Sequence, residues 1–147
     1  MPVDQSLVGR EFPPTAPLEV TVERVAAFAA SLGTSYDDAG TPPAVPPTYP
    51  IVLAFDAMQA FLASEQIDLF RIVHGEQRFT YERPVRLGDV LTATLSVVSL
   101  RQIGGADIIG TSSAITDADG ALVCTGRATL VHSAAPAATP SAEQETA

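Results

Sequence analysis

The chain has 147 residues, of which 46% are hydrophobic, and this is enough to bury one core without disulfides or a structural metal. Its net charge of −9, with eight scattered arginines and no lysine, excludes the clustered cations that bind nucleic acid. No apolar run approaches the roughly 18 residues that span a membrane. No export signal is evident, so we expect a cytoplasmic protein that does not bind membranes. The single cysteine, Cys124, excludes a disulfide, and we expect neither a metal nor a cofactor.

Two helices are predicted in the first half of the chain. Apolar residues recur at helical spacing over residues 21–32, with Thr21 as the N-cap and Gly33 as the stop. A loop with five prolines follows over residues 34–50. The second helix is predicted over residues 50–62 and is apolar on nearly every side, which is typical of a helix wrapped by other structure.

The second half of the chain is predicted to form strands. Residues 77–83, 90–103, 108–116 and 121–132 are rich in β-branched and aromatic side chains, and turn sequences rich in Gly and Asp separate them. Successive hairpins predict an antiparallel meander. A meander after one apolar helix indicates a single α+β domain of the hotdog kind, with the sheet wrapped around the helix. We expect this domain over residues 1–132 and a disordered tail over residues 133–147.

A sixteen-residue segment carries a family resemblance. Residues 74–89, HGEQRFTYERPVRLGD, resemble the signature of MaoC-like dehydratases, in which a Gln-containing strand leads to a Pro and a Gly-Asp turn. Residues 46–50 and 110–132 extend the likeness, which includes the N-terminal domains of FAS1-like dehydratases. It implies an acyl-thioester substrate, carried by acyl carrier protein or coenzyme A. It also implies a site between two subunits, and we expect a homodimer, with a heterodimer as the alternative.

The usual catalytic pair of that family is missing. Active members carry an Asp and a His about five residues apart after the first helix, whereas residues 31–41 contain no His. Tyr36, Asp37 and Asp38 stand there, and we interpret them as a polar loop. Some relatives with this loss are non-catalytic halves of heterodimeric dehydratases, and others add an amine such as glycine to an enoyl thioester.

Three functions therefore remain open. Our leading interpretation is an enzyme that adds an amine or water to the β-carbon of a 2-enoyl thioester, with or without hydrolysis of the thioester. The alternatives are a non-catalytic acyl-binding subunit of a heterodimeric dehydratase and a plain acyl thioesterase. Asp56 on the central helix is the candidate acid for the thioesterase, unless it only belongs to the polar stripe of the helix.

His74 is the main catalytic candidate, because it precedes the Gln-containing strand and an imidazole can serve as a general base. The alternative is a His bonded to a backbone carbonyl at the start of a strand. Gln77 matches the family position and is a candidate substrate-binding residue, or else a structural amide at the subunit interface. Glu76 could orient His74, or it could be a solvated charge. His132 is the weaker imidazole candidate.

The start of the central helix is the second candidate region. The backbone N–H groups of Ile51 and Val52 lack an intrahelical partner and could polarise a thioester carbonyl. Thr48 and Tyr49 would border the same spot, and Phe55 would lie beside the acyl chain. Packing at the helix entry and in the core is the alternative for these three side chains.

Several arginines could bind a phosphate or a carboxylate through the forked guanidinium group. Arg71, Arg78 and Arg101 are the candidates, and their spacing does not choose among them.

Overall fold

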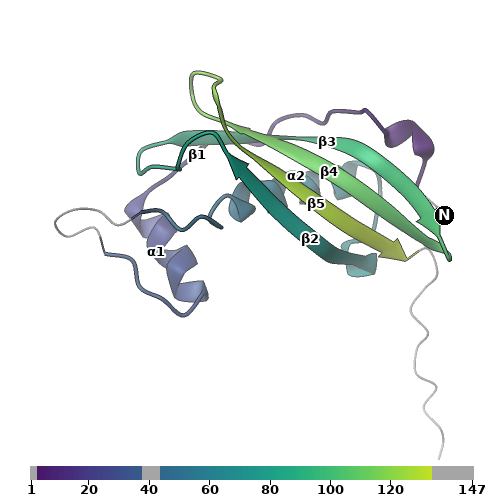
Figure 1. Cartoon of the computed structure of the whole chain (residues 1–147), viewed down its shortest axis with the longest axis horizontal. Coiled ribbons are helices and arrows are strands. Elements are labelled where there is room, and N and C mark those ends of the chain that lie inside the picture. The colour runs from purple at the N-terminus through teal and green to yellow at the C-terminus, as the bar shows by residue number, and fades with distance from the viewer. Residues whose placement is uncertain (1–2, 38–43, 134–147) are drawn as a thin grey trace, which may run out of the picture.

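The structure, a computed structural model, describes residues 3–37 and 44–133. A five-stranded antiparallel sheet curls around the helix α2, Ile51–Ser64, which crosses its concave face (Figure 1). This is the predicted α+β hotdog fold. In the part of the chain that the structure describes, no helix has the length and apolar character needed to cross a membrane.

Both predicted helices are present. The first, α1, spans Val22–Ser31, and the Thr21 hydroxyl caps it by accepting a hydrogen bond of 3.2 Å from the Arg24 N–H. Gly33 follows with a φ of +77°, a conformation that favours glycine at the end of a helix. The central helix α2 begins directly after Pro50, as predicted, and runs two residues beyond the predicted end. Two short 3₁₀ helices, Gln5–Leu7 and Leu69–Arg71, were not predicted.

The strand order corrects the expectation of a simple meander. The strands are β1 (Leu18–Glu19), β2 (Ile72–Tyr81), β3 (Val90–Ile103), β4 (Ala106–Thr116) and β5 (Leu122–Ser133), and they lie in the order β1-β3-β4-β5-β2. Only β3, β4 and β5 form a meander, while β2 pairs with β5 on the far side of the sheet. The connection of residues 82–89 contains Pro84 and is too long for a tight hairpin.

The core lies between α2 and the concave face of the sheet. Phe61 is fully buried there, and its ring contacts the ring of Phe12 at a centroid distance of 4.8 Å. The sheet contributes fully buried side chains from every long inner strand, namely Leu91, Leu95, Ile109, Ile115 and Leu130. Cys124 is also buried, as predicted, and burial raises the pKa of its thiol to about 11.

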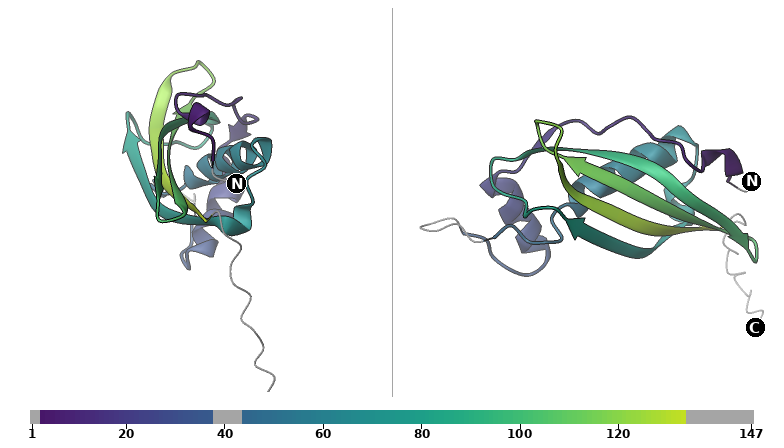
Figure 2. Two further views of the ribbon diagram at one scale, coloured as in Figure 1. Left: turned by 90° about the vertical axis from the view of Figure 1, so that its right-hand side faces the viewer. Right: turned by 45° about the horizontal axis from the view of Figure 1, so that its top comes forward.

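One edge of the sheet is covered by the N-terminal segment, and the other edge is open among the described residues. Along β3, the N-terminal segment covers the edge: the Gly9 N–H donates to the Val97 carbonyl at 2.8 Å, and the Phe12 N–H donates to the Leu95 carbonyl at 2.9 Å. Figure 2 shows this segment running past the sheet on the side opposite β2. The outer edge of β2 has no neighbouring strand among the described residues. A ten-residue strand with one open edge is a natural place for a second chain to pair.

The end of the predicted domain needs a small correction. Strand β5 continues through Ser133, one residue beyond the predicted boundary at residue 132. Residues 134–147 of the predicted tail lie outside the described residues, as does Asp38.

Candidate functional site

A β-bulge at Gly75 places His74 and Gln77 on the same face of β2. Residues three apart on a regular strand point to opposite faces. Here the pairing with β5 skips Gly75, so His74 lies opposite Leu130 and Gln77 lies opposite Ala128. Leu130 is fully buried in the core, and the two polar side chains therefore share the concave face of the sheet.

His74 and Gln77 contact each other directly. The Nε2 atom of His74 lies 3.0 Å from Oε1 of Gln77, and the Gln77 amide nitrogen donates to the Arg78 carbonyl at 3.4 Å. An amide oxygen only accepts, so His74 Nε2 carries the proton in this contact. In the tautomer with its proton on Nε2, the ring has its lone pair on Nδ1, and this atom has no hydrogen bond to a described residue. His74 is exposed, so this nitrogen is accessible to a ligand or a partner chain.

The His74–Gln77 pair stands at a small cavity between α2 and the sheet. The cavity has a volume of about 10 Å³. Besides the pair, it is lined by Ala54, Met58, Leu95, Thr111, Ser113, Gly126 and Ala128. Gly126 leaves room for the pair, since a Cβ there would lie 3.3 Å from the Gln77 amide nitrogen and 3.2 Å from the ring of Phe79.

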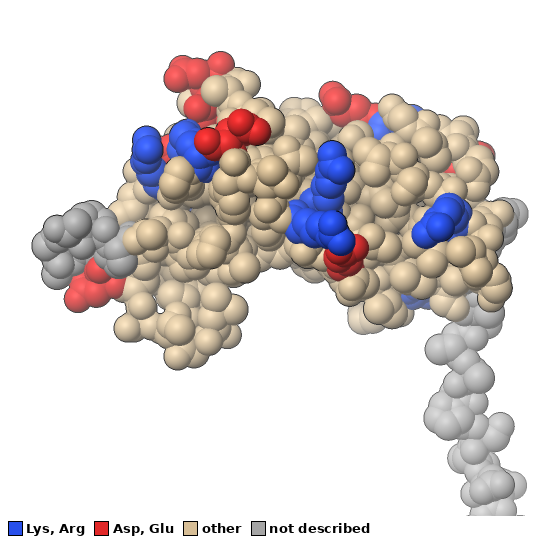
Figure 3. All heavy atoms as spheres, in the orientation of Figure 1, with Lys and Arg blue, Asp and Glu red and all other residues tan. Residues whose placement is uncertain are grey.

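The structure does not support Glu76 as the residue that orients His74. Glu76 lies opposite Thr129, on the convex face, and its carboxylate forms an ion pair with Arg78. Figure 3 shows acidic and basic side chains in contact on this outer face of the sheet. Among the described residues no carboxylate forms an ion pair with His74. The imidazole therefore has an amide partner instead of the acid that usually accompanies a catalytic His.

The first N–H groups of α2 have no partner within the helix, as expected, but they are paired with the turn that precedes it. The Ile51 N–H donates to the Thr48 carbonyl at 3.0 Å, and the Val52 N–H donates to the Tyr49 carbonyl at 3.1 Å. The turn that leads into the helix thus supplies the partners. An acyl carbonyl could bind these donors only by competing with bonds that already exist.

The predicted binding residues around the helix start face different surroundings. Tyr49 is 1% exposed, its ring packs edge-on against Phe28 at 5.5 Å, and burial raises the pKa of its hydroxyl. Tyr49 and Val52 line a hollow of about 280 Å³ beside α1, away from His74. Thr48 is exposed, and Phe55 is 39% exposed on a face of α2 that does not line the His74 cavity. The structure therefore brings only Gln77 of the predicted binding set to His74.

A second, apolar hollow of about 470 Å³ lies at the far end of β2. Its lining includes Val45, Pro46, Pro47, Tyr81 and Val85. The Tyr81 hydroxyl donates to the Pro47 carbonyl, and burial raises the pKa of Tyr81 to about 12. This contact ties the end of β2 to the loop that enters α2.

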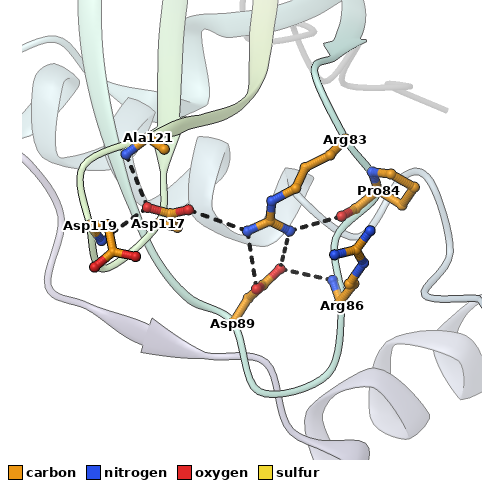
Figure 4. A network of polar contacts seen from close by, with 7 residues as sticks. All are labelled: Arg83, Pro84, Arg86, Asp89, Asp117, Asp119 and Ala121. Atoms are coloured by element: carbon orange, nitrogen blue, oxygen red, sulfur yellow. Dashed lines mark hydrogen bonds and ion pairs between the residues drawn. The ribbon is translucent and has the colours of Figure 1, made fainter.

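A polar network fixes the connection between β2 and β3 (Figure 4). Both terminal nitrogens of Arg83 bind the Asp89 carboxylate, at 2.8 and 3.1 Å, and Nη2 also lies 3.5 Å from Asp117 in the β4–β5 turn. Asp89 accepts a further hydrogen bond of 2.8 Å from the Arg86 N–H. Burial alone would raise the pKa of Asp89, but Arg83 and the Arg86 N–H hold it below its usual value. The Gly-Asp turn of the sequence signature is thus a structural anchor.

His132 belongs to a separate buried pair at the other end of the sheet. Its Nδ1 lies 3.1 Å from the Asp107 carboxylate, which also accepts a 3.0 Å hydrogen bond from the Val3 N–H. Burial alone would raise the pKa of Asp107, but the Val3 N–H and His132 lower it. The pair holds the N-terminal segment against β4 and β5, which gives His132 a structural role.

The remaining candidates do not meet at His74. Asp56 is exposed and does not line the His74 cavity, and Arg101 is exposed on β3. Arg78 pairs with Glu76 on the outer face, and Arg71 lines a different cavity beside Asp68. Tyr36 is half-buried and packs against the core. None of these side chains completes an acid–base pair with His74 within the described residues.

Two cavity residues escaped the analysis of the sequence. Thr111 and Ser113 are 3% exposed and point to the same buried face of β4 as Ile109 and Ile115. In the sequence these two polar residues alternate in step with apolar Ile109 and Ile115, and this pattern could have identified them as buried polar side chains.

Comparison with known proteins places the chain in a class. The model of the "FAS1-like, dehydratase domain region" family matches residues 6–126. Among solved structures, one chain of the HadBC (3R-hydroxyacyl-ACP dehydratase) complex of Mycobacterium tuberculosis is 26% identical, with a TM-score of 0.73, over 89% of this chain and 99% of that one. An (R)-hydratase of A. caviae is also 26% identical, with a TM-score of 0.60, over 86% and 98% of the two chains. The fold and the matched region define a hotdog protein of the dehydratase and hydratase class.

Closer relatives exist among curated proteins. A UPF0336 protein of Streptomyces coelicolor is 40% identical over 92% of this chain and 98% of its own length, and one of Leifsonia xyli is 41% identical over 89% and 96%. The chain therefore belongs to the UPF0336 proteins within the FAS1-like dehydratase family.

Proposed function

We propose that this chain is the acyl-binding subunit of a two-chain hotdog dehydratase, whose other subunit carries the catalytic acid and base. The observation that carries the proposal is the His74–Gln77 pair, in which the imidazole bonds a neutral amide at 3.0 Å and Glu76 points to the opposite face. Dehydration of a 3-hydroxyacyl thioester needs a group that removes the α-proton and a group that protonates the departing hydroxyl. Among the described residues no acid forms an ion pair with His74, so a mechanism with two separate groups would need the second group from another chain.

The relatives support a proposal for the class of substrate. The HadBC structure is described as a 3R-hydroxyacyl-ACP dehydratase complex, and the A. caviae protein is described as an (R)-hydratase. We propose 3-hydroxyacyl and 2-enoyl thioesters as ligands of this chain, carried by acyl carrier protein or coenzyme A in the cytoplasm. In this role His74 and Gln77 present polar groups to the acyl thioester, and the adjacent face of α2 contacts the chain.

The open edge of β2 supports pairing with a second hotdog chain. At one end of the strand Phe70 is 97% exposed and Val73 is 65% exposed, and at the other end lies the apolar hollow beside Tyr81. When two such strands pair antiparallel, the start of each meets the end of the other. A projecting aromatic side chain then lies beside an apolar hollow, and aromatic side chains in pockets are typical anchors of protein interfaces.

A homodimer with its own activity is the second candidate. It is favoured by the exposure of His74 and by the free Nδ1 lone pair, which could act as a general base. In that reaction an amine or water adds to the β-carbon of a 2-enoyl thioester, the π electrons move to the α-carbon, and His74 carries a proton from the nucleophile to that carbon. The thioesterase alternative has no support from Asp56, which lies away from the cavity.

The two candidates are separated with the purified full-length chain and crotonyl-CoA, with and without glycine, followed by mass spectrometry. The acyl-binding proposal predicts binding without any mass change of the crotonyl group. Turnover by the chain alone would support the second candidate. That turnover would have to be lost in His74→Ala and kept in the control Glu76→Gln, which alters the same strand on its outer face.

A further inference from the structure

Two hydroxyl-bearing residues, Thr111 and Ser113, lie on the buried face of β4, where apolar side chains are usual. Five alternate residues of β4 are buried, namely Asp107, Ile109, Thr111, Ser113 and Ile115. Asp107 accepts hydrogen bonds in its pair with His132 and the Val3 N–H, whereas Thr111 and Ser113 are hydroxylic, are 3% exposed and lie between the apolar Ile109 and Ile115. The two hydroxyls therefore interrupt the apolar part of this row.

Neither hydroxyl has a hydrogen-bond partner among the described residues, although both line the cavity beside His74 and Gln77. No fully buried side-chain oxygen among the described residues lacks a partner, so both hydroxyl oxygens keep some access to the cavity. Valine or alanine at these positions would fill the same space with apolar atoms. The two hydroxyls are thus available to a ligand group that enters the cavity.

The size and chemistry of the cavity limit what it can bind. A volume of about 10 Å³ corresponds to roughly one oxygen-sized group. The Ser113 and Thr111 hydroxyls can each donate and accept a hydrogen bond, and the Gln77 amide stands at the same cavity. Leu95, Ala54 and Ala128 make the rest of the wall apolar and provide no counter-charge. A neutral group that both donates and accepts fits this surrounding, and a carboxylate does not.

We propose that Thr111 and Ser113 form a subsite for a single hydroxyl group of the acyl ligand, the 3-hydroxyl of a 3-hydroxyacyl thioester. This inference rests on the proposed acyl-binding function and adds a determinant of specificity to it. The flexible side chain of Met58 borders the cavity and can move aside as the acyl chain enters between α2 and β2. The subsite would let the chain distinguish a hydroxyacyl ligand from a saturated one.

Calorimetric titration of the full-length chain with 3-hydroxyhexanoyl-CoA and with hexanoyl-CoA tests the subsite. The wild type is expected to bind the hydroxylated ligand roughly tenfold more tightly, which is the effect of one hydrogen bond to a buried group. In Thr111→Val and Ser113→Ala, the preference is expected to fall to about twofold or less, while the affinity for hexanoyl-CoA stays within about twofold.

Stability measurements separate a ligand-binding role from a structural one. Thermal unfolding of Thr111→Val and Ser113→Ala is expected at or above the wild-type temperature, because the lost hydroxyls have no partner to leave unpaired. The matched control is Thr92→Val, which removes a hydroxyl bonded to Thr116 at 3.0 Å. That variant is expected to unfold earlier and to keep the ligand preference.

Three results would overturn the subsite: a wild type without preference, variants that keep the full preference, or hydroxyl-deleted variants that unfold earlier than the wild type. A wild type that binds neither ligand would instead overturn the proposed acyl-binding function, and the subsite with it. The affinity for hexanoyl-CoA thus reports on the function, and the ratio of the two affinities reports on the subsite.

Discussion

Replacing Phe70 with serine is expected to weaken association of the chain without destabilising its fold. Phe70 is 97% exposed, so its ring contributes almost nothing to the core of one chain. Burying a phenylalanine side chain is worth about 1.5–3 kcal/mol. If the ring is buried against a second chain, each lost contact raises the dissociation constant roughly 10- to 150-fold.

Sedimentation over a dilution series measures this change, for the chain alone and for its mixture with another hotdog chain. The matched control is Ile103→Ser, which removes a side chain that is 56% exposed at the end of β3, on the opposite side of the sheet from β2. Both variants are expected to unfold within about 0.5 kcal/mol of the wild type as isolated chains. An unchanged dissociation constant in Phe70→Ser would refute the assignment of β2 and its flanks to the interface.

Three further predictions concern the site and its supports. Gly126→Ala places a methyl group 3.3 Å from the Gln77 amide nitrogen, so binding of an acyl thioester, measured by calorimetry, is expected to weaken several-fold with a stability loss of about 1 kcal/mol. The folded-state pKa of Asp107 is lowered, so its stabilising effect is complete above the reference value of 3.8 and is lost as the pH falls through the folded value. Asp107→Asn is therefore expected to cost about 2 kcal/mol in urea unfolding at pH 7, and the gap to the wild type is expected to shrink as the pH falls through the folded-state pKa of Asp107; a gap independent of pH would contradict this. Arg83→Lys cannot bind both oxygens of Asp89, and thermal unfolding is expected to report a loss of about 1 kcal/mol.

The local parts of the fold could be predicted from the sequence because they depend on short-range patterns. Strand β3 has the predicted bounds, Val90–Ile103, and α2 starts where its proline indicates. The start of β2 was predicted five residues late, at 77, because the bulge at Gly75 interrupts the alternation that marks a strand. The pairing of β2 with β5 joins segments about fifty residues apart, and no short-range pattern encodes it.

The candidate site could be predicted only in part, because its geometry depends on strand pairing and turn geometry that short-range sequence patterns do not encode. His74 and Gln77 could be chosen by residue type and motif, but the bulge determines that they share a face. The pairing of the Ile51 N–H with the Thr48 carbonyl depends on the turn geometry before the helix, which the prolines of the loop do not specify. Thr111 was missed because its meaning depends on which face of β4 meets α2.

The most direct test of the two-chain account is the rate of hydration of crotonyl-CoA by the purified chain alone and by its complex with a hotdog chain that carries an Asp and His pair. The account predicts no hydration by the chain alone and rapid hydration by the complex. It further predicts that Gln77→Ala in this chain raises the KM of the complex more than it lowers kcat, because Gln77 binds and does not transfer protons. Hydration by the chain alone, at a rate that added partner does not change, would contradict it.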